Sequence, residues 1–113
     1  MSPSTPTLLV ITNAPDEPTA TRIAEALVSA RAAACVNIMG VCTSIYRWEG
    51  KIERAGEIPM FIKTTAQCYA AVQATIRDIH PYSVPEIIAV PVTAGLPEYL
   101  AWIADETVQE TRA

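Results

Sequence analysis

The first part of the chain combines a short apolar run with a longer segment of helical spacing. Residues 7–13, TLLVITN, are apolar and partly β-branched and are followed by Ala-Pro-Asp, which predicts a buried strand. Asp16 comes next and suits the N-cap of a helix. Apolar residues then recur every three or four positions, at Ala20, Ile23, Ala24, Leu27 and Val28. We expect this helix to pack its apolar face against the strand.

The middle of the chain predicts a long β-hairpin. Residues 34–49 are rich in Val, Ile, Thr, Tyr and Trp, and residues 51–65 return as the partner strand. Glu49 and Gly50 between them predict a tight turn. Both strands exceed the usual length of about five or six residues, and Gly40 marks an expected bend or bulge. The outer half of such a hairpin must overhang a small sheet.

A second helix is predicted over residues 65–80. Thr64 or Thr65 is the expected cap, and the His80-Pro81 pair is expected to stop the helix. Its apolar stripe consists of Tyr69, Val72, Ile76 and Ile79.

The end of the chain predicts a strand and a short helix. Residues 86–95 read as a fourth strand, in which Pro91 favours an edge position or a bulge. Pro97 suits the first turn of a last helix. The polar residues after Thr107 are expected to fray.

The resulting order is β-α-β-β-α-β with a C-terminal helix. This is the split βαβ, or ferredoxin-like, pattern of the α+β class, with two helices on one face of an antiparallel sheet. The other face lacks cover within one chain, and a second copy is the expected cover. We predict a single domain over residues 1–113, with an ordered core at about 7–107.

Composition removes several functional classes. The chain has 113 residues, of which 50% are hydrophobic and 18% charged, and its net charge is −4. That balance is too apolar for disorder, and without a Lys/Arg cluster the electrostatic basis of nucleic-acid binding is missing. The N-terminus lacks the basic region of a signal peptide and no apolar run spans a membrane. We therefore expect a cytoplasmic protein.

The three cysteines predict free thiols rather than a disulfide framework. Cys35, Cys42 and Cys68 show no Cys-x-x-Cys spacing. Cys35 and Cys68 are expected to be reduced and substantially buried. Thiols also favour soft metals such as Cu(I), although no chelating triad is visible within one chain.

The stretch HPYSVPEIIAV supports two interpretations of the single histidine. His80 suits the C-terminal end of a helix, where it can bond the last carbonyls. It can also act as a metal ligand, with Glu86 orienting the imidazole or sharing the cation. We expect the rigid loop to bring His80 and Glu86 to a cleft lined by a neighbouring subunit, and Lys63 and Tyr46 to complete it.

Aromatic residues outside the helical stripe predict an interface. They are Tyr46, Trp48, Tyr82, Tyr99 and Trp102. Motifs for catalysis or nucleotide binding are absent, because the four glycines are scattered and neither a serine elbow nor HExxH occurs. We therefore expect that the protein is not an enzyme.

Four segments in this order resemble the CutA divalent-cation tolerance family: ACVNIMGVCTSIYRWEGKI, EIPMFIKTT, HPYSVPEIIAVPV and YLAWI. The similarity runs from about Leu8 to Thr107. It implies a ferredoxin-like homotrimer that binds copper or another divalent cation, with no cofactor required for folding. The positions carried over include His80, Glu86 and Cys35 as metal-site candidates. Ser83 stands where an acidic residue is common in the family.

The resemblance leaves three functions open. The favoured hypothesis is a trimeric protein that binds or senses metal ions. The alternative is a trimeric signalling or scaffold module, similar to the PII proteins, that binds a small anion or a partner protein. An enzyme of unrecognised activity is the third.

Overall fold

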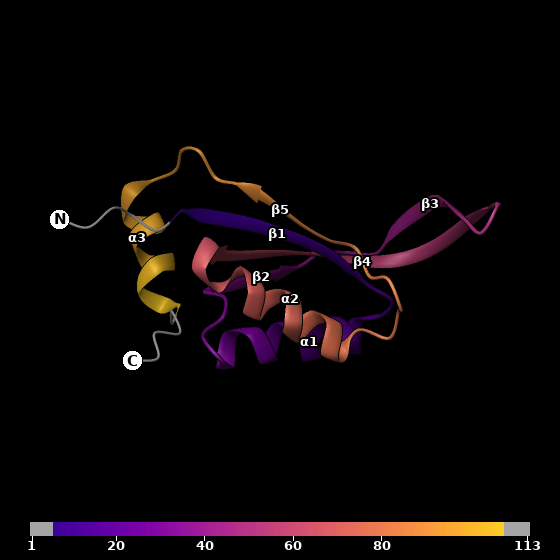
Figure 1. Cartoon of the computed structure of the whole chain (residues 1–113), viewed down its shortest axis with the longest axis horizontal. Coiled ribbons are helices and arrows are strands. Elements are labelled where there is room, and N and C mark those ends of the chain that lie inside the picture. The colour runs from indigo at the N-terminus through magenta and orange to yellow at the C-terminus, as the bar shows by residue number, and fades with distance from the viewer. Residues whose placement is uncertain (1–5, 108–113) are drawn as a thin grey trace.

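The fold is an antiparallel sheet with two helices packed against one face (Figure 1). The computed structural model describes residues 6–107. The elements are β1 (Thr7–Ala14), α1 (Glu17–Ser29), β2 (Cys35–Ile38), β3 (Cys42–Trp48), β4 (Lys51–Thr65), the 3-10 turn η1 (Ala66–Cys68), α2 (Tyr69–Ile79), β5 (Ile87–Pro91) and α3 (Pro97–Glu106). The α+β class and the antiparallel sheet agree with the prediction from the sequence.

The sheet has the strand order β2-β4-β1-β5, with β3 pairing only with β4. β1 pairs with the inner half of β4 from Thr7 opposite Thr65 to Ala14 opposite Ile58. β5 lies at the end of this order, so Pro91 occupies an edge strand within the chain, where its missing N–H is tolerated.

The core lies between the sheet and helices α1 and α2. Every second residue of the central strands faces the helices, as the two-residue period of a strand requires. The largest buried apolar side chains of this layer are Val10, Ile23, Leu27, Met60, Ile62, Val72 and Ile76. The predicted stripe of α2 is confirmed, because Val72 and Ile76 are buried while Tyr69 and Ile79 pack against the core from its rim.

Of the two predicted helix N-caps, the structure shows one and not the other. The Asp16 side chain accepts a hydrogen bond of 2.8 Å from the backbone N–H of Thr19, so the predicted cap of α1 is confirmed. The threonine cap of the second helix is wrong. Thr65 stands at the start of η1 without a capping bond from its side chain, and the Thr64 hydroxyl donates to the Ala32 carbonyl instead.

The predicted hairpin projects beyond the helices. We call residues 42–56, which are β3 and the outer part of β4, the arm. Glu49 and Gly50 have φ values of 51° and 81°, the left-handed conformations that a two-residue hairpin turn requires. The first hairpin strand is interrupted around Gly40 rather than continuous, because β2 ends at Ile38 and β3 starts at Cys42. The arm gives the molecule its extents of 52 × 29 × 24 Å.

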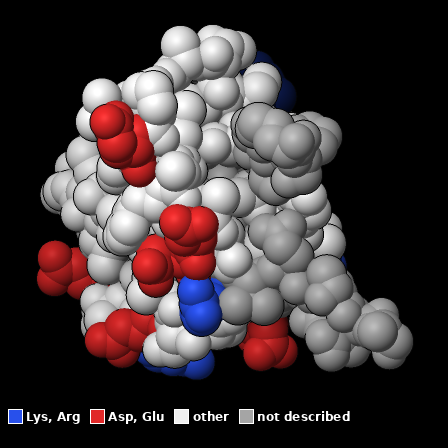
Figure 2. All heavy atoms as spheres, turned by 90° about the vertical axis from the view of Figure 1, so that its left-hand side faces the viewer, with Lys and Arg blue, Asp and Glu red and all other residues white. Residues whose placement is uncertain are grey.

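Helix α3 lies at the end of the molecule opposite the arm (Figure 1). Its Ile103 is buried, and the Arg31 guanidinium donates hydrogen bonds to the carbonyls of Asp105 and Glu106 at the helix end. This end carries several acidic side chains and few basic ones (Figure 2). Among residues 6–107, no helix is long and apolar enough to cross a membrane.

Candidate functional site

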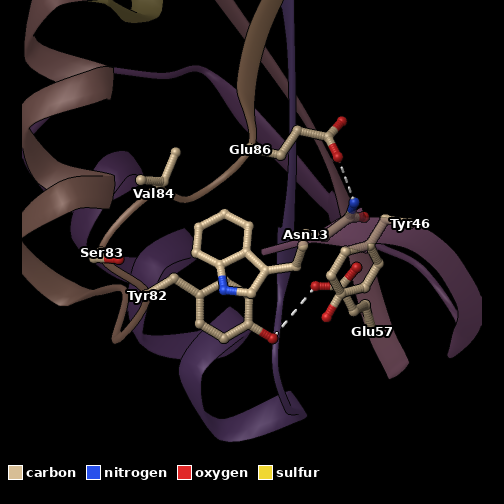
Figure 3. Close-up of a pocket in the computed structure, with 8 residues that line it drawn as sticks. Asn13, Tyr46, Glu57, Tyr82, Ser83, Val84 and Glu86 are labelled. Atoms are coloured by element: carbon tan, nitrogen blue, oxygen red, sulfur yellow. Dashed lines mark hydrogen bonds between the residues drawn. The ribbon is translucent and has the colours of Figure 1, made fainter. Parts of the chain in front are cut away.

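A cavity of about 340 Å³ lies where the base of the arm meets the loop from α2 to β5. The arm supplies two lining residues from β3, β4 adds Glu57 just beyond the arm, the loop contributes four residues, and Asn13 of β1 closes the cavity (Figure 3). The lining residues are Asn13, Tyr46, Trp48, Glu57, Tyr82, Ser83, Val84 and Glu86. Segments far apart in the sequence therefore meet at this point.

His80 holds the loop that forms one wall of this cavity. It is the C-cap residue of α2 and is 6% exposed. Its Nδ1 accepts a hydrogen bond of 3.2 Å from the Tyr82 backbone N–H, so Nε2 carries the ring hydrogen and donates to the Asn13 carbonyl at 2.7 Å. Both ring nitrogens are engaged, and in this arrangement His80 positions the loop rather than presenting a lone pair to a metal ion.

Two carboxylates supply the charge of the cavity lining. Glu86 accepts a hydrogen bond of 2.8 Å from the amide nitrogen of Asn13, and Glu57 lies 3.4 Å from the donating hydroxyl of Tyr82 (Figure 3). Glu57 is buried, whereas Glu86 is exposed. No Lys or Arg belongs to the lining residues, so the lining has a negative charge.

Three aromatic side chains give the cavity its apolar surface. Tyr46 and Trp48 come from β3, and Tyr82 comes from the loop. Burial raises the pKa of the Tyr82 hydroxyl above its ordinary value, and the nearby Glu57 carboxylate raises this pKa further. Tyr82 is therefore a neutral hydrogen-bond donor at pH 7.

Two of the predicted pocket or interface residues do not line this cavity within the described chain. Lys63 pairs with Cys35 across β2 and β4, with its Nζ 3.8 Å from the Cys35 sulfur and hydrogen-bonded to the Asn37 side chain. Trp102 stacks on Tyr99 of α3, with ring centroids 5.6 Å apart. The cause is the length of β4, which separates Glu57 from Lys63 by six positions along one strand.

The structure does not bring the three metal-site candidates together. Glu86 lies in the cavity lining, His80 lies behind it, and Cys35 lies with Lys63 further along the sheet. Within residues 6–107, no group of three His, Cys, Asp or Glu side chains is arranged to hold a metal ion. The described part of one chain thus offers at most a partial ligand set.

The three cysteines all lie in the described part of the chain, and none is in a disulfide. Cys68 is buried as predicted, whereas Cys35 and Cys42 are partly buried. Tyr99 has a raised pKa because of burial and because of the neighbouring Cys35.

Asn13, Glu57 and Val84 line the cavity but were not among the predicted site residues. Asn13 was taken only as the end of the first strand. Its backbone carbonyl faces His80 and its side chain faces Glu86, so it links both ends of the loop to β1. The only signal in the sequence was a polar residue at the end of a predicted buried strand. Its partners, His80 and Glu86, lie 67 and 73 positions away, so no local pattern indicates the contact.

Comparison with known proteins identifies relatives over most of the chain. Residues 8–106 match the family described as CutA1 divalent ion tolerance protein. The divalent-cation tolerance protein CutA of Thermus thermophilus is 42% identical over 99 residues, which cover 88% of this chain and 96% of that protein. Protein CutA of Mus musculus is 47% identical over 93 residues, and there the match covers 82% of this chain but only 52% of the mouse protein.

Solved structures agree with this relationship. The Thermus thermophilus divalent cation tolerance protein superposes with a TM-score of 0.89 at 41% identity, covering 90% of this chain and 99% of that one. The Archaeoglobus fulgidus protein, described as a periplasmic divalent cation tolerance protein CutA, gives a TM-score of 0.86 at 39% identity, covering 88% and 97%. This chain belongs to the CutA1 divalent ion tolerance protein family.

Proposed function

We propose that this protein serves divalent-cation tolerance by binding cations at the cavity beside the arm. The observation that carries the proposal is the charge of the lining, where Glu57 and Glu86 are present and Lys and Arg are absent. A carboxylate pair in a partly enclosed site attracts a cation more strongly than the same pair in bulk water.

The proposed ligands are oxygen atoms. Glu57 and Glu86 each offer a carboxylate, and Asn13 carries an amide oxygen, a donor that divalent cations also accept. Water or a neighbouring chain completes the coordination. Among the first-row divalent ions we favour Cu(II), because a given set of donor atoms binds it most tightly in that series. His80 contributes by fixing the loop that carries Glu86.

We further propose that the working unit is a homotrimer. The arm exposes large apolar side chains, with Ile45 at 61% and Ile52 at 70%, which a single chain leaves without cover. The strand order β2-β4-β1-β5 supports a ferredoxin-like arrangement, whose edge strands neighbouring copies can pair with. The thiols support a reducing compartment such as the cytoplasm.

The anion-binding alternative has less support at this cavity. A small anion would meet Glu57 and Glu86, whereas Lys63, the expected partner of an anion, is engaged with Asn37 at another part of the sheet. Electrostatic repulsion therefore disfavours it.

The test is calorimetric titration of the reduced protein with Cu(II) and Zn(II), with Glu86→Gln and Glu57→Gln as cavity variants. Glu98→Gln, which removes a carboxylate from the first turn of α3, is the matched control. Loss of a cavity carboxylate is expected to weaken binding about 10–100-fold, the loss typical of an important metal-site residue. Equal affinities for the cavity variants and the control would refute the proposal.

A further inference from the structure

The aromatic part of the cavity has no role in the proposed metal site. Divalent ions bind oxygen, nitrogen or sulfur donors, and the faces of Tyr46 and Trp48 offer none of these. A volume of about 340 Å³ falls in the range of pockets that hold small molecules and is large for a single metal ion. The cavity therefore suits a cation larger than a metal ion.

The rings reach the cavity from two different elements. Tyr46 and Trp48 are two residues apart on β3, so their side chains lie on the same face of the strand. Tyr82 reaches the cavity from the loop, and its hydroxyl is directed toward Glu57 (Figure 3). The Glu57 carboxylate thus shares the cavity with aromatic side chains from both elements.

The Tyr82 ring is held in place by two contacts, while the two rings of β3 are partly exposed. His80 contacts Tyr82 edge-on, with centroids 4.6 Å apart and planes at 62°, and the Tyr82 hydroxyl donates to Glu57. The ring contacts found within residues 6–107 are this pair and Tyr99 with Trp102, so neither Tyr46 nor Trp48 stacks on another ring there. The three lining rings remain 40–45% exposed.

Aromatic faces next to a carboxylate are the surroundings that bind organic ammonium ions. The negative face of each ring attracts the positive charge, and methyl groups on nitrogen pack against the ring without needing hydrogen-bond acceptors. A carboxylate nearby supplies the counter-charge. Glu57 is buried behind these rings, so it acts at short range with limited competition from water.

We propose that the cavity binds small alkylammonium ions, with the cationic head against Tyr46, Trp48 and Tyr82 and Glu57 as its counter-ion. The inference rests on the proposed preference of this cavity for cations and adds a second class of ligand to it. Both ligands use Glu57, but metal binding also depends on Glu86 and the Asn13 amide oxygen, whereas alkylammonium binding also depends on the rings. Substitution of the rings therefore separates the two activities.

The two tryptophans of the chain provide a direct readout. In a Trp102→Phe variant, Trp48 is the single tryptophan, and its fluorescence reports on the cavity. Titration with tetramethylammonium chloride is expected to give a saturable change in this fluorescence. Sodium chloride at equal ionic strength and tert-butanol, a neutral molecule of similar shape, are expected to give none.

Substitution of the rings sharpens the test. In the Trp102→Phe background, Tyr82→Leu and Tyr46→Leu are each expected to weaken tetramethylammonium binding by about 2–30-fold, the range of one cation–π contact. Tyr82→Phe retains the ring and is expected to bind within about twofold of its parent. The mass of the assembly and its melting temperature are measured for every variant to detect misfolding. Because there are two independent leucine variants, the test survives if one of them fails to fold.

Each possible failure has a distinct signature. Metal binding without a saturable tetramethylammonium response overturns the inference and leaves the proposed function intact. A response that tert-butanol reproduces, or that survives both leucine substitutions, also overturns it. Tetramethylammonium binding in a protein that fails to bind Cu(II) and Zn(II) supports the inference and refutes the metal site.

Discussion

The two halves of β4 belong to one continuous strand but have opposite surroundings. From Ile58 to Thr65 the strand pairs with β1, its central part also pairs with β2, and Met60, Ile62 and Thr64 are fully buried. From Lys51 to Gly56 it pairs only with β3, and no residue there is buried. The same backbone hydrogen-bonding pattern is therefore present with and without a core beneath it.

This difference separates the apolar side chains that one chain can bury from those that it leaves exposed. The inner half gains from apolar burial against α1 and α2, the dominant favourable contribution to folding. The arm forms its hairpin by local pairing, yet Ile45 and Ile52 stay exposed within the single chain. The cavity lies at the boundary, where buried Glu57 follows exposed Gly56.

The largest expected effect on stability comes from truncating a core side chain in the inner half of β4. Ile62→Ala is expected to lower the free energy of unfolding by about 2–5 kcal/mol, because it removes buried methyl groups and leaves a cavity. Ile52→Ala on the arm is the matched control, measured by denaturant unfolding at one protein concentration. If the two variants lose the same free energy of unfolding, the proposed difference in burial between the two halves of β4 is wrong.

The next effect concerns the assembly rather than the fold of the chain. Ile45→Glu and Ile52→Glu place a charge on the exposed apolar surface of the arm and are expected to shift the trimer towards monomer in sedimentation equilibrium. The far-ultraviolet circular dichroism of the chain should stay unchanged. A wild-type protein that sediments as a monomer at micromolar concentration would contradict the account of the arm.

A smaller effect is expected at alkaline pH at the boundary between the halves. The pKa of Tyr82 is raised above its ordinary value of 10.0 in the folded protein, first by burial and then by Glu57. The unfolded chain thus loses this proton first, and stability is expected to fall as pH rises from about 10 through the folded pKa. Tyr82→Phe should flatten this part of the melting temperature profile between pH 9 and 11, and a profile unchanged by the substitution would argue against the Tyr82–Glu57 contact.

The smallest effect is expected at the start of α1, far from the arm. Thr19 lowers the pKa of Asp16 by hydrogen bonding to its carboxylate. The stabilisation is present above the ordinary pKa of an aspartate and is lost as pH falls through the lower folded value. Asp16→Ala should therefore lower the melting temperature at pH 7 but hardly at pH 2. A difference that persists at pH 2 would mean that the charge is not its source.

Local signals in the sequence predicted the elements well. The Glu49-Gly50 pair between two strand segments predicted a tight turn, and both residues have the left-handed conformations that such a turn requires. Asp16 was predicted as a cap from its place before an apolar periodic segment, and it caps α1. The interruption around Gly40 was expected as a bend or bulge, and the pairing with β4 shifts there by one residue, from Ile38 opposite Met60 to Cys42 opposite Glu57. The failed Thr65 cap reflects a 3-10 turn that starts the second helix, which composition does not reveal.

The site was harder to predict because it depends on contacts between distant segments. Tyr46 and Glu86 were expected at one cleft, and both line the cavity. Lys63 does not line the cavity within the described chain, because the register of β4 against β2, which no local pattern specifies, places it opposite Cys35. Asn13 was missed for the same reason, since only the folded chain brings it to the loop.

The central claim is that cations bind at the cavity through its carboxylates, and anomalous diffraction tests it most directly. Crystals grown with one equivalent of Zn(II) per chain, from reduced protein, allow the ion to be located at the zinc absorption edge. The account predicts an anomalous peak at about 2.0–2.2 Å from carboxylate oxygens of Glu57 or Glu86, the usual zinc–oxygen distance. A peak on the Cys35 thiol with none in the cavity would contradict it.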